Sequence, residues 1–99
     1  MRRGDAGVSD VTIRLPTPLR GFVGGRDQVT VSGGTVREAL LALTAGQDIF
    51  RDRLFTTDGE LRRFVNVYLG RDDVRRLGGL DAALPGGATL TLMVALAGG

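Results

Sequence analysis

The carboxyl end of the sequence holds the strongest candidate for chemistry. The last eight residues read LMVALAGG, an apolar run that closes on two glycines. Glycine lacks a Cβ, so Gly98-Gly99 could enter a channel too narrow for any side chain. Extended beyond a strand that ends near Ala95, four residues would reach about 13–14 Å, at ~3.3–3.6 Å each. We therefore expect the end of the chain to present the Gly99 carboxylate inside the active site of another protein. The expected tether is Leu96, Ala97 and Gly98.

Side chains elsewhere offer little catalytic chemistry. The 99 residues include no His and no Cys, which removes the usual general base, the thiol nucleophile and most metal ligands. All 13 basic residues are Arg, so no side-chain amine competes for an activated carboxyl group, although a compositional bias toward Arg explains this equally well. The carboxylates of Asp72-Asp73 and of Asp48 and Asp52 fit turn and helix-surface roles better than catalysis. The Gly-rich stretches 21–25 and 33–35 lack the Lys of a phosphate loop.

Charge and hydropathy exclude other classes of function. The net charge is only +2, from 13 basic and 11 acidic residues, and the two signs alternate as in RDR at 51–53. A groove that follows nucleic-acid phosphates needs a stripe of one sign. No apolar run approaches the roughly 18–20 residues that cross a bilayer, and the start of the chain lacks the apolar stretch of a secretory signal. We expect a cytoplasmic protein that binds neither nucleic acid nor membrane.

The first third of the chain predicts a hairpin of two strands. Apolar and polar residues alternate at 11–15 and again at 28–32, as in strands with one buried face. Pro16 and Pro18 end the first strand, and 21–27 is expected to be a Gly-rich turn. Residues 1–9 are small and polar and are expected to form a flexible leader.

A change of period predicts one main helix within 33–46. An apolar stripe recurs at helical spacing, Thr35 and Glu38 fit a capping box, and Gly46 suits the carboxyl-terminal stop. The stripe is Val36, Ala39, Leu40 and Leu43. So short a helix must pack against a sheet to be stable.

The rest of the chain predicts two further strands and short connections. Residues 48–55 are expected to form a turn or two of helix, 64–70 a strand, and 77–84 little more than a turn. The last strand, within 85–96, is apolar at almost every position, so we expect it to be buried on both faces and central in the sheet. Pairing it in parallel with the first strand gives an α+β fold of the β-grasp, ubiquitin-like type, with one main helix across a mixed sheet. We expect the domain to span 10–95 and the tail 96–99.

One segment and the chain end resemble a known family. The stretch RRFVNVYLGRDDVRRLGGLDAAL at 62–84, together with the final AGG, resembles the MoaD/ThiS family of small ubiquitin-like sulfur-carrier proteins, and within it the CysO type most strongly. The resemblance covers about residues 11–99. Three positions depart from the family pattern: Gly70 replaces the usual Asn, PGGAT at 85–89 replaces an acidic turn, and Val94 replaces a common proline. These departures leave the terminal chemistry intact and the partner and pathway open.

The resemblance implies a protein substrate rather than an enzyme. An E1-like adenylating enzyme of the MoeB/ThiF type would use ATP and Mg to adenylate the Gly99 carboxylate. A sulfur donor, such as a rhodanese-type protein, would convert it to a thiocarboxylate. A biosynthetic enzyme would then take that sulfur for cysteine, a cofactor or a secondary metabolite. The chain itself would bind no cofactor and no metal.

Other functions remain open at this point. The chain could be a ubiquitin-like modifier that forms isopeptide bonds with lysines, or a MoaD-like small subunit of molybdopterin synthase. A third alternative is an interaction domain whose diglycine is incidental, and only this one predicts that function survives deletion of Gly98-Gly99.

The strand at 64–70 carries a candidate surface for partners. Val65, Val67 and Leu69 share the face expected in the core, and Phe64, Asn66 and Tyr68 share the other. The second set would form an exposed docking patch or would pack beneath residues 47–60, and the pattern favours neither. Arg62 and Arg63, just before it, would meet an acidic partner surface or be merely solvated.

Overall fold

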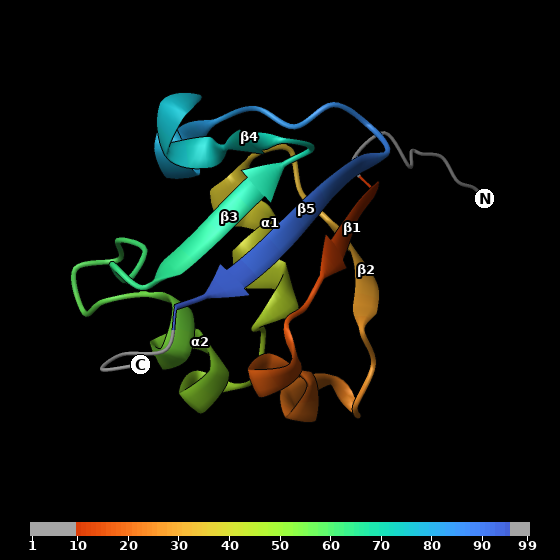
Figure 1. Ribbon diagram of the computed structural model, residues 1–99, viewed down its shortest axis with the longest axis vertical. Coiled ribbons are helices and arrows are strands. Elements are labelled where there is room, and N and C mark those ends of the chain that lie inside the picture. Colours follow the sequence, from red (N-terminus) through yellow and green to blue (C-terminus); the bar gives the residue numbers. More distant parts are fainter. Residues whose placement is uncertain (1–9, 96–99) are drawn as a thin grey trace.

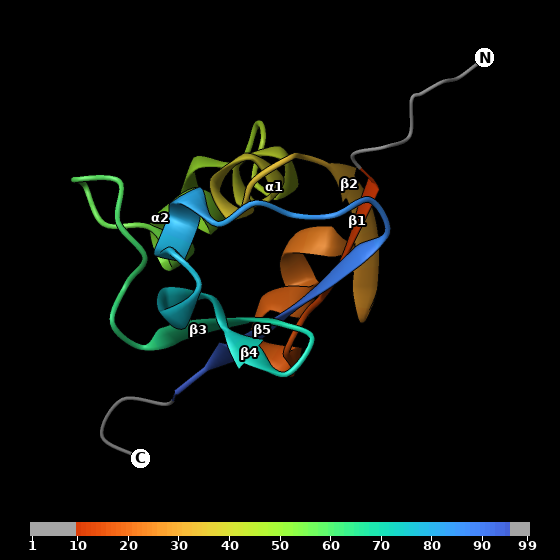
Figure 2. The ribbon, with the colours of Figure 1, turned by 90° about the horizontal axis from the view of Figure 1, so that it is seen from above.

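A five-stranded mixed sheet organises residues 10–95, the part of the chain that the computed structural model describes. The helices α1 and α2 cover one face of this sheet (Figures 1 and 2). The predicted leader 1–9 and tail 96–99 lie outside the described residues, so those parts of the predicted domain organisation stay predictions. Among residues 10–95, no helix is long and apolar enough to cross a membrane.

The predicted hairpin is confirmed, but its connection differs from the expected turn. Strand β1 (Asp10–Arg14) pairs antiparallel with β2 (Gln28–Ser32). Between them the 3-10 helix η1 (Thr17–Val23) occupies much of the segment expected to be loop, because a proline at its start favours helical φ. The ring of Phe22 also stacks on Phe50, with centroids 4.5 Å apart, which anchors η1 to the core. The turn itself follows, at Gly24 with φ 69°.

Helix α1 (Val36–Leu43) forms where the apolar stripe predicts it. All four stripe residues are buried. The Thr35 hydroxyl accepts a hydrogen bond from the Glu38 N–H at 3.2 Å, but the Glu38 carboxylate accepts from the Gly34 N–H at 2.7 Å rather than from the capping residue itself. The helix ends at Leu43, the buried hydroxyl of Thr44 donates to the Leu40 carbonyl at 2.9 Å, and Gly46 takes a left-handed φ of 76° just beyond, as expected of a glycine stop.

The second half of the chain alternates short elements with two longer strands. The expected turn or two of helix is α2 (Asp48–Leu54), followed by strands β3 (Val65–Leu69) and β4 (Asp72–Asp73). Two 3-10 helices, η2 (Val74–Arg76) and η3 (Gly79–Asp81), precede the last strand β5 (Ala88–Val94).

Strand β5 is central, as expected, but not for the predicted reason. The strand order is β2-β1-β5-β3-β4, with β5 parallel to β1 and antiparallel to β3, which confirms the β-grasp topology. Burial on both faces is wrong: Leu90 and Leu92 are buried, whereas Thr89 and Met93 are exposed. The helices cover one face only (Figure 2), so the other face of β5 stays open to solvent.

Candidate functional site

The point where the predicted tail begins is held firmly by the sheet. The N–H of Ala95 donates to the carbonyl of Phe64 at 2.9 Å, which extends the β3–β5 ladder one residue beyond Val94. The tether residues Leu96, Ala97 and Gly98 and the acceptor Gly99 lie outside the described residues. Ala95, the last residue that the structure describes, is held at the carboxyl end of the central strand. We call Ala95 the tail root.

The uncovered face of the sheet forms a shallow hollow beside the tail root. Cross-strand neighbours Asn66 and Met93, and Tyr68 and Thr91, share this face. Together with Ala95 they line a hollow of about 460 Å³. None of the residues lining it comes from 47–60, so the structure places Tyr68 on the open side of the sheet and not beneath that segment.

Two large apolar side chains are exposed on this side of the sheet. Met93 is 49% exposed and Phe64, at the start of β3, is 39% exposed. Exposed apolar groups beside polar ones are typical of surfaces that bind other proteins. We call Phe64, Asn66, Tyr68, Thr91 and Met93 the open face.

Sequence reasoning did not include Thr91 and Met93 of the open face, or Arg14 beside it. Arg14 is exposed and lies opposite Thr91 through the parallel β1–β5 pairing, and it lines a second hollow with Thr91 and Met93. Arg14 and Met93 each occupy an outward-facing position of a strand in which buried and exposed residues alternate. This alternation could have indicated that both side chains are exposed. Only the pairing of distant strands reveals that they are neighbours.

The two arginines before β3, for which contact with a partner and simple solvation were both left open, have different surroundings. Arg62 is half-buried, donates from its side chain to the Asp52 carbonyl, and donates its N–H to the Leu54 carbonyl at 2.9 Å. Arg63 is exposed. Arg62 therefore ties the start of β3 to α2, and only Arg63 presents its full side chain to solvent.

Arg75 holds the start of β3 from the other side. Its guanidinium donates to the carbonyls of Arg62 at 3.1 Å and Val65 at 2.8 Å, and to Oδ1 of Asn66 at 2.9 Å. The same segment supplies the Phe64 carbonyl that accepts the Ala95 N–H. Arg75 thus fixes both the tail root and one side chain of the open face. No pattern in the sequence distinguishes it from its neighbour Arg76.

The predicted acidic pairs have structural roles. An oxygen of Asp73 accepts the Arg75 N–H at 2.9 Å and caps η2, and Asp48 forms an ion pair with Arg51 on α2 at 2.6 Å. No group of metal-binding side chains occurs within residues 10–95.

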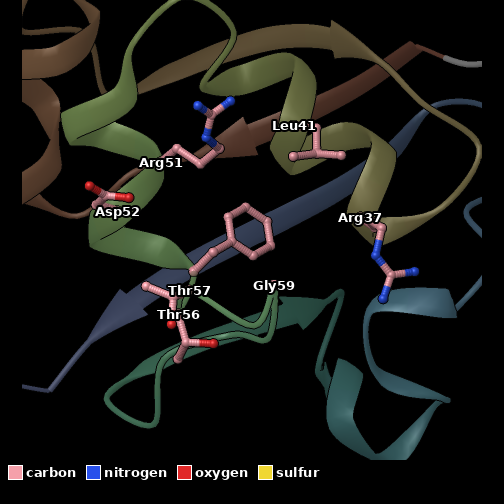
Figure 3. A pocket seen from close by; sticks show the side chains of 8 residues that line it. Arg37, Leu41, Arg51, Asp52, Thr56, Thr57 and Gly59 are labelled. Carbon is pink, nitrogen blue, oxygen red and sulfur yellow. The ribbon is translucent and has the colours of Figure 1, made fainter.

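Another hollow lies on the helix side of the molecule. It has a volume of about 340 Å³ and is lined by residues of both helices, among them Arg37 and Leu41 of α1 and Arg51 and Asp52 of α2 (Figure 3). Arg37 pairs with Asp81, and Arg51 with Asp48, so both guanidinium groups already have a carboxylate partner. The hollow shares no residue with the open face.

Comparison with known proteins identifies the family. No protein-family model matches the sequence. The sulfur carrier protein CysO of Mycobacterium tuberculosis is 39% identical over 92 residues, which cover 91% of this chain and 99% of that protein. The chain belongs to the CysO family of sulfur carrier proteins. The resemblance inferred from residues 62–84 and the final AGG is thereby confirmed.

Solved structures of CysO proteins share the fold. A chain in the crystal structure of the Amycolatopsis orientalis BexX/CysO complex is 40% identical, with a TM-score of 0.81 over 90% of this chain and 99% of that one. The small archaeal modifier protein SAMP1 of Haloferax volcanii is 29% identical, with a TM-score of 0.75 over 91% of this chain and 99% of that one. The ubiquitin-like β-grasp fold is therefore shown by relatives as well as by strand order.

Proposed function

We propose that the chain carries sulfur as a thiocarboxylate on Gly99. The observation that carries this proposal is the 39% identity to CysO sulfur carriers over nearly their whole length. Two features of the chain support it. The sequence supplies Gly98 and Gly99 three and four residues beyond the tail root, and the composition offers no thiol on which sulfur could be held, because it contains no Cys.

The chemistry needs an activating partner. An oxygen of the Gly99 carboxylate attacks the α-phosphorus of ATP, pyrophosphate leaves, and a mixed anhydride with AMP remains. Hydrosulfide then attacks the carbonyl carbon, displaces AMP and loses its proton, which leaves the thiocarboxylate. Where the donor is a persulfide, the attack forms an acyl disulfide, and a second thiol reduces its S–S bond to release the thiocarboxylate. In this proposal the partner is an E1-like enzyme of the MoeB/ThiF type with ATP and Mg, and a rhodanese-type protein is one source of the sulfur. A partner that binds hydrophobic and aromatic side chains beside the tail can use that binding energy to position the Gly99 carboxylate for reaction.

The open face is the surface we assign to that docking. It adjoins the tail root through the Ala95–Phe64 hydrogen bond, so a partner seated on Tyr68 and Met93 meets the tail as it leaves the sheet. Arg63 and Arg14 are exposed near this surface and would meet carboxylates of the partner. Rim charges of this kind act mainly on the rate of association.

ATP–pyrophosphate exchange by a MoeB/ThiF-type enzyme tests the activation step. Exchange should depend on the chain and disappear when Gly99 is deleted. Tyr68→Ala and Met93→Ala should raise the KM for the chain by about tenfold, which corresponds to the ~1–2 kcal/mol typical of an exposed interface anchor. Thr57→Ala, on the exposed helix-side loop, is the matched control and should leave KM unchanged. Exchange that persists without Gly99 contradicts the proposal.

The likeness to SAMP1 favours one second function, conjugation to other proteins. The activated Gly99 would then be attacked by a lysine amine of a target, giving an isopeptide bond. Covalent adducts of higher mass in a cell extract that contains ATP, absent when Gly99 is deleted, would support this function. The cytoplasmic location stays a prediction.

A further inference from the structure

The two edges of the sheet differ in how they are protected. Exposed edge strands are usually kept short, charged or interrupted, because their unpaired backbone groups can pair with another chain. Strand β4 follows this rule, with two residues that are both Asp. Strand β2 does not: its five residues read QVTVS, without charge or proline, and it pairs with β1 in unbroken one-to-one register.

The backbone groups on the outer side of β2 can be assigned from the ladder. The Leu15 N–H donates to the Asp27 carbonyl at 2.8 Å, and hydrogen-bonded pairs alternate along an antiparallel ladder. Val29 and Val31 therefore bond to β1, whereas Gln28, Thr30 and Ser32 direct their N–H and C=O groups outward.

Nothing in the described part of the chain covers this edge. Strand β2 lies at the margin of the molecule in both views, with no helix beyond it (Figures 1 and 2). No turn, loop or side-chain hydrogen bond within residues 10–95 reaches Gln28, Thr30 or Ser32. The first half of the strand instead borders an open hollow of about 600 Å³.

The sequence of β2 is complementary to itself. QVTVS reads as polar, Val, Thr, Val, polar in either direction, so an antiparallel copy centred on Thr30 meets the same pattern. We propose that β2 pairs with β2 of a second copy of this chain about a two-fold axis at Thr30. Gln28 then faces Ser32 of the second copy, and the three outward residues form about six backbone hydrogen bonds, two for each narrow pair.

Side chains and charges suit this pairing. Val29 and Val31 are half-buried on the helix side, and each meets the other valine of the second copy. In the same register the charged residues Arg26 and Asp27 lie opposite glycines 34 and 33, so like charges do not meet. Because each copy uses its own β2 edge to bind the β2 edge of the other, the assembly ends at two copies related by a two-fold axis. The outer edges of the joined sheet are then the two acidic β4 strands.

The dimer keeps both tail roots accessible. The β5 strands of the two copies are five strand spacings apart, about 24 Å at ~4.8 Å each, and they run in opposite directions because the copies are related by a two-fold axis. Each open face and each Ala95 remains free to meet a partner. The pairing does not depend on the sulfur chemistry and can be tested without it.

Sedimentation velocity on the full-length chain tests the proposal. The edge is short and the interface small, so the dimer should be weak and should accumulate as the concentration rises from about 10 µM to about 1 mM. Thr30→Lys places like charges across the two-fold axis and should keep the chain monomeric, and so should Thr30→Asp. An equimolar mixture of T30K with T30D should recover the dimer. Thr89→Lys, an exposed threonine on the central strand β5, is the matched control and should dimerise as the unsubstituted chain does.

Amide hydrogen exchange of Thr30 supplies the second readout. In the unsubstituted chain its exchange should slow as the concentration rises, while that of Val31, already bonded to β1, should change less. The proposal is overturned if the unsubstituted chain stays monomeric at about 1 mM or if the exchange of Thr30 does not depend on concentration. It is also overturned if T30K dimerises as strongly as the unsubstituted chain, or if the mixture of T30K and T30D stays monomeric. Circular dichroism confirms that the variants remain folded.

Discussion

The guanidinium of Arg75 gives the most specific prediction about how the tail root is held. Its three hydrogen bonds join η2 to the Arg62 and Val65 carbonyls and to the Asn66 side chain. Arg75→Met keeps most of the aliphatic stem and removes every donor. The neighbouring substitution Arg76→Met removes the same charge from the same short helix, and Arg76 is likewise exposed, so the pair separates the hydrogen bonds from the charge.

The expected loss of stability follows from the geometry. A typical hydrogen bond contributes about 0.5–1.5 kcal/mol net, and the exposure of Arg75 puts these bonds at the lower end because water competes for the donors. Arg75→Met should therefore lower the free energy of unfolding by about 1–2 kcal/mol. For a domain of about 100 residues this lowers the Tm by about 5–15 °C. Arg76→Met should change the free energy by less than about 0.5 kcal/mol.

Two measurements check this reasoning. Thermal unfolding followed by circular dichroism gives the difference in Tm between the two variants. Amide exchange at Ala95, whose N–H bonds to the Phe64 carbonyl, should accelerate in Arg75→Met and not in Arg76→Met. Equal Tm values for the two variants, or unchanged exchange at Ala95, would refute the role given to Arg75.

Three further tests address the packing that positions the sheet. Gly33→Ala would place a Cβ 2.6 Å from a backbone nitrogen of α1, so it should lower the free energy of unfolding, measured in urea, by more than about 2 kcal/mol. The control Gly34→Ala should be nearly neutral, because the nearest atom to its Cβ would be a flexible carboxylate oxygen at 3.4 Å. Equal losses in the two variants would contradict the close approach of Gly33 to α1. Thr35→Ala removes the cap of α1 and should cost about 0.5–2 kcal/mol, and a neutral result would show that the cap contributes nothing. A double-mutant cycle with Phe22→Leu and Phe50→Leu should give a coupling of about 0.5–1.5 kcal/mol from the stacked rings, and strictly additive losses would argue against stacking.

Local periodicity was sufficient to predict the elements that bury one face. The stripe on α1 and the alternation in β1, β2 and β3 each record which side of an element meets the core, and the structure confirms all of them. The error at β5 has the same origin. Apolar composition does not distinguish a strand buried on two faces from one whose outward positions hold Met93 beside two threonines.

Features that depend on contacts between distant segments were not predictable in this way. The open face takes shape only when β3 and β5 lie side by side, and Arg14 lies beside it only through the pairing of β1 with β5, so Arg14 and Met93 look ordinary in the sequence. The roles of Arg62 and Arg75 depend on which carbonyl groups lie within reach. Helix η1 was not predicted, and its last residues fall in the turn expected at 21–27, because its stabilising contact, Phe22 on Phe50, joins positions far apart in the chain.

The central claim is that sulfur is carried on Gly99, and intact-protein mass spectrometry tests it most directly. The chain is incubated with a MoeB/ThiF-type enzyme, ATP, Mg and a sulfide source, in parallel with a variant that lacks Gly99. The account predicts a mass gain that corresponds to replacement of one oxygen by sulfur, located on the carboxyl-terminal peptide and absent from the variant. An unchanged mass in a folded chain that the enzyme demonstrably adenylates would contradict it.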